Sequence, residues 1–253
     1  MNHKPAWRDW LGSAAVTLAL LAVWAGVAHW RWISPVYLPS PLDAWASLSE
    51  GMLRGDLSRL TLGTIERMIY GWLLASLAGI GLGALIGVSA AMRIWVQPML
   101  ELVRPLPASA LIPLAIALLG LSPAMVLCVI AFGAVWPVLL ATVHGFASVE
   151  PRLEEVARVL GLSRLQFIVK IGLPNALADA LGGLRLSLTI ALILAVVGEM
   201  LASQDGLGTA ILQAARSFRS ADLFAGVALL GAIGFASNLL LSLFERRMLA
   251  WKR

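Results

Sequence analysis

Charged side chains inside long apolar stretches are the residues of this chain best placed to do chemistry. Arg104 and Arg185 are examples, each flanked by hydrophobic residues. A charge inside a membrane helix costs about 2.5–3.5 kcal/mol on insertion scales, so it usually faces protein or water. A guanidinium there can bind an anion's oxygens, or it can simply pair with a carboxylate or carbonyl of the chain. The candidates to line a polar pathway are Glu101, Arg104, Ser109, Asp179, Arg185 and Glu199.

Sequence patterns typical of catalysis are missing from this chain. It has no GxxxxGK[ST] phosphate loop, so we expect no ATP hydrolysis by the chain itself. His3, His29 and His144 form neither an HExxH pair nor any other metal-ligand spacing. Cys128 is the only cysteine, which excludes an internal disulfide and a cysteine-based metal site. We therefore expect no catalytic residue, no metal and no cofactor in this chain.

The composition is that of a membrane protein. Of the 253 residues, 60% are hydrophobic and 13% are charged, whereas soluble domains carry about 25% charged residues. The mean hydropathy is +0.87. The net charge of +5 comes from basic residues that flank apolar runs rather than cluster, so we expect no binding of nucleic acid. No polar stretch is long enough to form a separate soluble core.

Apolar runs long enough to cross a bilayer predict an all-α, polytopic helix bundle with about six transmembrane helices. The predicted spans are residues 11–28, 68–91, 99–119, 123–144, 180–201 and 223–244. The prolines at positions 105, 107 and 113 should kink or break the third span, as is tolerated beside a cavity. The first span can alternatively be a cleaved secretory signal, because Gly26-Val27-Ala28 resembles a cleavage site. We divide the chain into an N-terminal helix with an external segment, 1–66, and a core, 67–253.

The distribution of basic residues predicts cytoplasmic N- and C-termini. With six spans, the cytoplasmic segments then hold Lys4, Arg8, Arg93, Arg152, Arg158, Arg164, Lys170, Arg246, Arg247, Lys252 and Arg253. Fewer basic residues lie outside, namely Arg31, Arg54, Arg59, Arg67, Arg216 and Arg219. This excess inside is the usual pattern of membrane proteins. Residues 145–175 therefore face the cytoplasm.

Three shorter features concern packing and turns. The second span places small residues at every fourth position, forming a groove for another backbone, within one subunit or between subunits: Gly71, Ala75, Gly79, Gly83, Gly87 and Ala91. The segment after Ser40 favours an amphipathic helix lying in the membrane interface. The turn Gly206-Leu207-Gly208 is either an outer rim or an ordinary helix break.

Residues 145–175 are longer and more polar than a simple connection requires. Ser148 is predicted to cap a helix that begins near Pro151, and Gly161 is predicted to end it. Ser163 then caps a second short helix, and the chain turns at Pro174 to enter the fifth span. The small residues Ala157 and Gly161 would let a partner approach closely. A solvated connector without a partner is the alternative.

The segment EEVARVLGLSRLQFIVKIGLP, residues 154–174, resembles the signature loop of ABC importer permeases. That loop reads Glu-Ala-Ala, three residues, Gly, nine residues, Ile, any residue, Leu-Pro. This chain departs from it only in having Val156 for the first alanine. The resemblance implies that these residues contact an ATPase: Glu155, Ala157, Arg158, Gly161, Ser163, Ile171, Leu173 and Pro174.

Other segments are similar to permeases of the taurine, alkanesulfonate and nitrate importers. They are YLPSP (37–41), ELVRPLPASALIPLAIALLGLS (101–122) and GEMLASQDGLGTAILQAARSF (198–218). The resemblance implies a bacterial inner-membrane importer subunit for a small anion. It also implies a second copy of this chain, two ATPase subunits that bind ATP and Mg, and an extracytoplasmic binding protein. Its alternatives are an ion-coupled secondary transporter, for which the expected internal repeat is missing, and an intramembrane enzyme, for which catalytic groups are missing.

Overall fold

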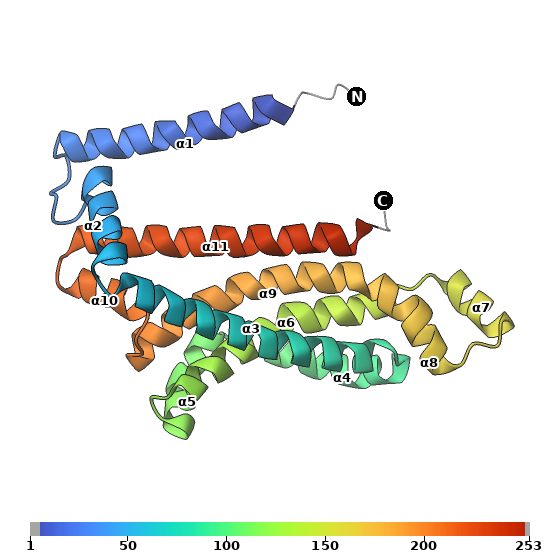
Figure 1. The fold of residues 1–253 in the computed structure, drawn as a ribbon. Coiled ribbons are helices and arrows are strands. Elements are labelled where there is room, and N and C mark those ends of the chain that lie inside the picture. Colours follow the sequence, from blue (N-terminus) through green and yellow to red (C-terminus); the bar gives the residue numbers. More distant parts are fainter. Residues whose placement is uncertain (1–5, 251–253) are drawn as a thin grey trace. The chain divides into compact units, whose positions relative to one another are not determined.

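The computed structural model describes residues 6–250, and every regular element in that range is a helix (Figure 1). Lys4, Lys252 and Arg253, which contribute to the predicted orientation, lie outside the described residues. The elements are α1 (Ala6–His29), α2 (Pro41–Leu53), α3 (Leu57–Gly87), α4 (Ala90–Val103), the 3₁₀ helix η1 (Ala108–Leu111), α5 (Ile112–Leu119), α6 (Pro123–Ala147), α7 (Pro151–Val159), α8 (Arg164–Phe167), the π-helical turn η2 (Ile168–Gly172), α9 (Leu173–Ala202), α10 (Leu207–Arg216) and α11 (Ser220–Met248).

Five helical runs are long and apolar enough to cross a membrane, and a bent pair makes a sixth candidate. The five lie in α1, α3, α6, the run from α8 through α9, and α11. The bent pair is 90–103 with 108–119, at 75°. Pro105 and Pro107 fall in the break between them. Proline has no N–H to donate to the helical hydrogen bond, and its ring clashes with the backbone of the preceding turn. The predicted kink of the third span and the all-α membrane bundle are confirmed.

Contacts within the chain define two compact units. Unit 1 contains residues 1–60 and 210–231, and unit 2 contains residues 61–209 and 232–253. The division at residue 66 stays a prediction about domains.

Unit 1 is organised around α2. Ser40 caps this helix, because its hydroxyl accepts a hydrogen bond from the Asp43 N–H at 3.1 Å and its own N–H donates to the Asp43 carboxylate at 3.2 Å. Ser47 of α2 donates to Asp222 of α11 at 2.6 Å. Trp24 of α1 donates its indole N–H to the Pro39 carbonyl at 2.9 Å. The helix predicted after Ser40 is present, and its place in the membrane interface stays a prediction.

The small-residue groove of α3 is filled by α6 of the same chain. A Cβ added to Gly79 would lie 2.8 Å from the Cβ of Val138, and one added to Gly87 would lie 2.7 Å from the Cβ of Phe146. A Cβ on Gly71 would overlap Ile130. The groove therefore serves packing within one subunit. Ala91 does not belong to it, because α3 ends at Gly87 and Ala91 lies on α4.

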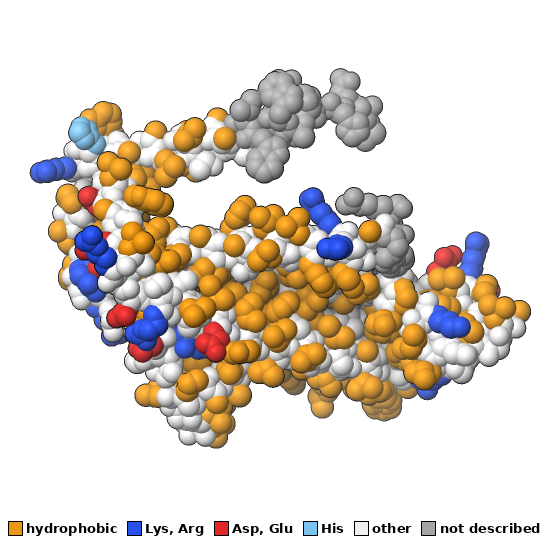
Figure 2. All heavy atoms as spheres, viewed as in Figure 1, with side chains coloured by type: hydrophobic (Ala, Val, Ile, Leu, Met, Phe, Trp, Pro, Cys, Tyr) orange, Lys and Arg blue, Asp and Glu red, His pale blue; other side chains and the backbone are white. Residues whose placement is uncertain are grey.

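Helices α6 and α9 form the centre of unit 2. The two helices approach closely where each has a small residue: a Cβ on Gly145 would lie 2.6 Å from the Cα of Ala176. The Ser187 hydroxyl of α9 donates to the Ala134 carbonyl of α6 at 2.7 Å, and Ser187 is completely buried. Hydrophobic side chains cover much of unit 2 on the face that Figure 2 shows, as expected of a surface that faces lipid.

Candidate functional site

The short helices α7 and α8 form the candidate coupling surface, residues 151–174, and Gly161 separates them. Gly161 has φ of +65°, a conformation that glycine adopts at little cost. The Leu162 N–H bonds to the Ala157 carbonyl at 3.0 Å and the Gly161 N–H to the Arg158 carbonyl at 3.1 Å, which is a Schellman motif. Ser163 then caps α8 together with Gln166. The predicted stop at Gly161 and cap at Ser163 are confirmed.

The predicted cap at Ser148 is wrong. Helix α7 begins at Pro151, so its N-cap is Glu150, whose side chain makes no capping hydrogen bond. Ser148 instead ends α6, and its hydroxyl accepts a hydrogen bond from the Asn175 amide at 3.2 Å. Ser148 lies too far before Pro151 to reach the first free N–H groups of α7. It ties the end of α6 to the start of α9 instead.

Pro174 lies at the start of the fifth span, as predicted, but no loop separates this span from α8. α8, η2 and α9 form one helical run, Arg164–Ala202, of 39 residues. Pro174 stands in the first turn of α9, where its missing N–H matters little. The π-helical turn just before it gives a wider ring, in which the Leu173 N–H bonds to the Ile168 carbonyl. The proline is therefore accommodated without interrupting the helical run.

Apolar side chains of the coupling surface remain uncovered in the single chain. Val159 is 87% exposed, Leu160 is 67% exposed and Leu165 is 70% exposed. The predicted contact residues Glu155, Arg158, Gly161, Ser163 and Leu173 are exposed too, whereas Ile171 and Pro174 are half-buried. Ala157 is buried, so it packs within the chain rather than offering its small side to a partner.

A cavity of about 560 Å³ in unit 2 contains two of the predicted pathway residues, Arg104 and Ser109. It lies between the bent third span, α6 and α9, and its other walls are mostly apolar, as at Leu140, Ile190 and Leu194. The break after α4 places Ser109 there, because η1 starts anew at Ala108. The bend predicted from the prolines thus borders a cavity.

Trp136 of α6 lines the same cavity, and its indole nitrogen is buried without a hydrogen-bond partner. No side-chain hydrogen bond or ion pair is recorded for Arg104 or Ser109 among residues 6–250. A buried polar group without a partner is rare and costly, so the Trp136 N–H can donate to a solute in this cavity, beside the exposed Arg104 and Ser109. Sequence reasoning missed Trp136, because a tryptophan in an apolar run is usually a packing residue. No local signal distinguished it.

The other charged candidates of the spans pair elsewhere. Asp179 contacts His144 at 3.2 Å, and Arg185 pairs with Glu245 of α11. Glu101 accepts a hydrogen bond from the Gln97 amide at 3.0 Å. None of the three candidates lines the cavity of Arg104, and Arg185 pairs with a carboxylate of the chain, one of the two outcomes expected for it.

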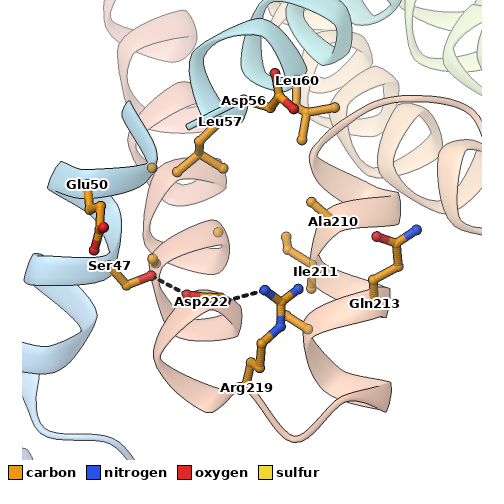
Figure 3. Close-up of a pocket in the computed structure, with 14 residues that line it drawn as sticks. Ser47, Glu50, Asp56, Leu57, Leu60, Ala210, Ile211, Gln213, Arg219 and Asp222 are labelled. Carbon is orange, nitrogen blue, oxygen red and sulfur yellow. Dashed lines mark hydrogen bonds and ion pairs between the residues drawn. The ribbon is translucent and has the colours of Figure 1, made fainter. Parts of the chain in front are cut away.

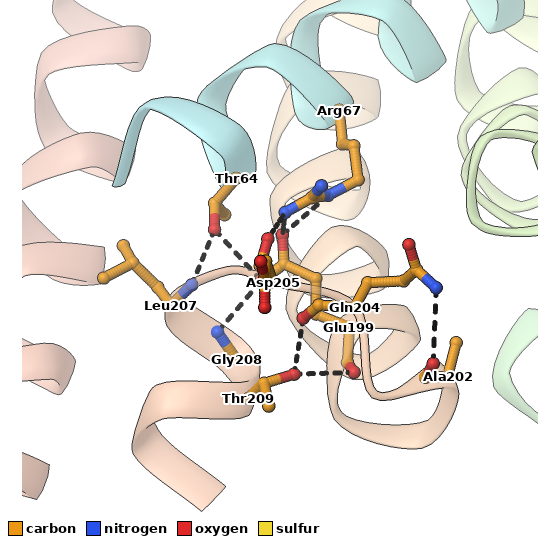
Figure 4. A network of polar contacts seen from close by, with 9 residues as sticks. All are labelled: Thr64, Arg67, Glu199, Ala202, Gln204, Asp205, Leu207, Gly208 and Thr209. Atoms are coloured by element: carbon orange, nitrogen blue, oxygen red, sulfur yellow. Dashed lines mark hydrogen bonds and ion pairs between the residues drawn. The ribbon is translucent and has the colours of Figure 1, made fainter. Parts of the chain in front are cut away.

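Glu199 occupies a separate, completely buried position at the end of α9 (Figure 4). Its carboxylate binds Arg67 and Thr64 of α3 and the N–H of Gly208. Glu199 also lies outside the cavity of Arg104. The turn Gly206-Leu207-Gly208, open to two interpretations from sequence, is part of this buried network.

A second cavity of about 560 Å³ lies within unit 1 (Figure 3). Its polar lining includes Ser47 and Glu50 from α2, Asp56, and Arg219 and Asp222 beside α11. Asp222 is paired with both Ser47 and Arg219, at 2.6 and 3.0 Å. The sequence did not predict this cavity, since its walls come from segments more than a hundred residues apart.

Comparison with known proteins agrees with this arrangement of broken spans and short helices. Residues 76–250 match the family described as "Binding-protein-dependent transport system inner membrane component". The chain belongs to this family, and it is therefore a multi-pass membrane permease subunit of an ABC importer.

Among relatives, the chain is 32% identical to SsuC of Bacillus subtilis (strain 168), named as a permease for aliphatic sulfonates, over 96% of this chain and 88% of that protein. It is 32% identical to the taurine transport system permease protein TauC of Escherichia coli (strain K12), over 99% and 94%. It is 31% identical to the nitrate import permease protein NrtB of Leptolyngbya laminosa, over 73% and 66%.

Among solved structures, the fold is similar to that of the MetNI methionine ABC transporter in inward-facing conformations. The TM-score is 0.67 at 17% identity, and the match covers 76% of this chain and 95% of that chain. An amino acid ABC transporter with histidines matches with a TM-score of 0.60 at 21% identity, over 76% and 93%. These likenesses concern the fold.

Proposed function

We propose that this permease passes a small organic anion, of the sulfonate or taurine type or similar to nitrate, that an extracytoplasmic binding protein delivers. The relatives named for aliphatic sulfonates, taurine and nitrate support this class. The cavity of Arg104, Ser109 and Trp136 supports it too, because the guanidinium, the hydroxyl and the indole N–H can each donate a hydrogen bond to an anion. Its apolar walls suit a short carbon chain beside the anionic group.

The driving force comes from ATP hydrolysis in a separate subunit that docks on the coupling surface. The observation that carries this proposal is the pair α7 and α8, with Val159, Leu160 and Leu165 uncovered beside the charged Glu155 and Arg158. Exposed apolar side chains on a polar helix pair are typical of a docking element. A transporter in the bacterial inner membrane would hold two copies of this chain and two ATPases, with both termini and the coupling surface in the cytoplasm.

Gly161 offers the sharpest test of the docking role. A Cβ built there meets no atom within 4 Å, so a side chain would project outward rather than into the chain. Because φ is +65°, however, most substitutions also strain the backbone. Gly161→Asn is the matched control, since asparagine tolerates this conformation and adds little bulk and no charge.

The experiment compares ATPase co-purification and ATP-driven uptake into proteoliposomes for the parent, Gly161→Asn and Gly161→Glu. We expect the asparagine variant to keep both and the glutamate variant to lose both, while both variants are inserted and stable in detergent. Normal ATPase binding and uptake by Gly161→Glu would contradict the docking role. Uptake that follows an ion gradient without any ATPase would favour a secondary transporter instead.

A further inference from the structure

The Glu199 carboxylate accepts hydrogen bonds at both of its oxygens (Figure 4). Oε1 accepts from Arg67 Nε at 2.9 Å and from Arg67 Nη2 at 2.7 Å. Oε2 accepts from the Thr64 hydroxyl at 3.0 Å and from the Gly208 N–H at 2.9 Å. Glu199 is 0% exposed and the Arg67 side chain is 16% exposed. This charge is therefore fully compensated where water does not reach it.

The turn after α9 is built around that carboxylate. The Leu207 N–H donates to the Thr64 hydroxyl at 2.9 Å, and Arg67 donates to the Asp205 carbonyl. A Cβ on Gly206 would overlap the Glu199 carboxylate, and one on Gly208 would overlap the Val196 carbonyl. The glycines are thus required by the close approach of the turn to the carboxylate.

Glu199 also stands at one end of the run Arg164–Ala202, whose other end is α8 of the coupling surface. Within this run α9 has 30 residues and is about 45 Å long, and η2 joins it to α8. Packed helices shift largely as rigid elements. A displacement of α8 that passes through η2 would therefore move α9, and with it the segments that are hydrogen-bonded to Glu199.

We propose that Glu199 is a positioning residue that clamps the 203–208 turn and the start of α10 onto α3, so that these segments move as one body when α8 is displaced. The inference rests on the proposed function, since it names the segments that move when the ATPase displaces α8. Without the clamp, movement of α9 would be taken up by the turn instead of reaching α3.

The physical reason for a permanent clamp is the cost of opening it. Removing one partner from a buried ion pair leaves an uncompensated charge and is strongly destabilising. Two oxygens, four hydrogen bonds and two glycine contacts would have to separate together. The arrangement suits a junction that stays closed throughout the cycle, rather than a gate that opens on each turnover.

Glu199→Gln tests the clamp, because it keeps the size of the side chain but removes its charge and leaves Arg67 without an ionic partner. Ser203→Asn is the matched control: Ser203 lies on the same turn, is exposed, and has the left-handed conformation that asparagine tolerates. In reconstituted complexes with the ATPase, we expect the solute transported per ATP hydrolysed to fall about tenfold in Glu199→Gln, as for loss of one charged hydrogen bond. The ATPase rate should stay within about twofold.

That ratio separates positioning from simple stability. A variant that only destabilised the chain would lower the amount of assembled complex, and would lower uptake and ATP hydrolysis together. An unchanged ratio in Glu199→Gln would overturn the proposal. If the parent complex itself showed no ATP-driven uptake, the proposed function would fail, which is a different result.

A cross-link tests the clamp without removing it. A Cβ on Gly63 would lie 3.4 Å from the Asp205 carbonyl oxygen, so Gly63→Cys with Asp205→Cys, in a Cys128→Ser background, is the pair to oxidise to a disulfide. We expect the bridge to form and the oxidised complex to keep its uptake. Uptake that stops on oxidation and returns on reduction would show that the turn leaves α3 during transport. That result would overturn the proposal.

Discussion

Replacing Gly83 of α3 with alanine is expected to push α3 away from α6. The added Cβ would lie 2.7 Å from the Cβ of Thr142 and 2.8 Å from the Leu139 carbonyl oxygen. The carbonyl belongs to the backbone and cannot rotate away. Since carbon atoms pack at about 3.5–4.0 Å, the helices must part locally by roughly 1 Å.

Gly81→Ala is the matched substitution on the same helix, because a Cβ on Gly81 meets nothing within 4 Å. Alanine gains about 0.8–1.0 kcal/mol over glycine inside a helix, and this gain is common to both variants. Overpacking costs about 1–3 kcal/mol and applies to Gly83→Ala alone. The two variants should therefore differ in stability by about 1–3 kcal/mol.

Thermal unfolding in detergent measures this difference. At about 2–4 °C per kcal/mol for a chain of this size, Gly83→Ala should have a Tm about 2–12 °C below that of Gly81→Ala. Equal Tm values would refute the close packing of α3 on α6. A change in oligomeric state with an unchanged Tm would instead assign the groove to an interface between subunits.

Two further predictions concern the charged and polar groups of unit 2. Trp136→Phe removes the unpartnered indole N–H but keeps an aromatic ring. It should raise the KM for the transported anion severalfold and leave the ATPase rate unchanged. An unchanged KM would exclude Trp136 from the pathway. Arg185→Leu and Glu245→Leu should each lower the Tm, and the double variant should be more stable than either single one by about 1–3 kcal/mol, because it leaves no unpaired charge. A double variant less stable than both would refute the pairing.

Local sequence was sufficient for most of the secondary structure. Apolar runs of sufficient length predicted the spans, and prolines predicted the break in the third. The stop at Gly161 and the cap at Ser163 were also correct, because such motifs depend only on residues a few positions apart. Ser148 was misassigned because two helix ends compete for it within a few residues, and only the contact with Asn175 shows which end it serves.

The membrane class, the spans and the boundaries of the short helices follow from the amino-acid sequence, since these depend on hydropathy and on contacts between residues that are near in the chain. The partners of the charged groups were decided by tertiary structure alone. Arg67 lies 132 positions before Glu199, and Arg185 lies 60 before Glu245. No local period relates such residues. In a low-dielectric interior each charge must nevertheless find a partner or water, and only the packing of α3, α9 and α11 determines which partner lies within reach.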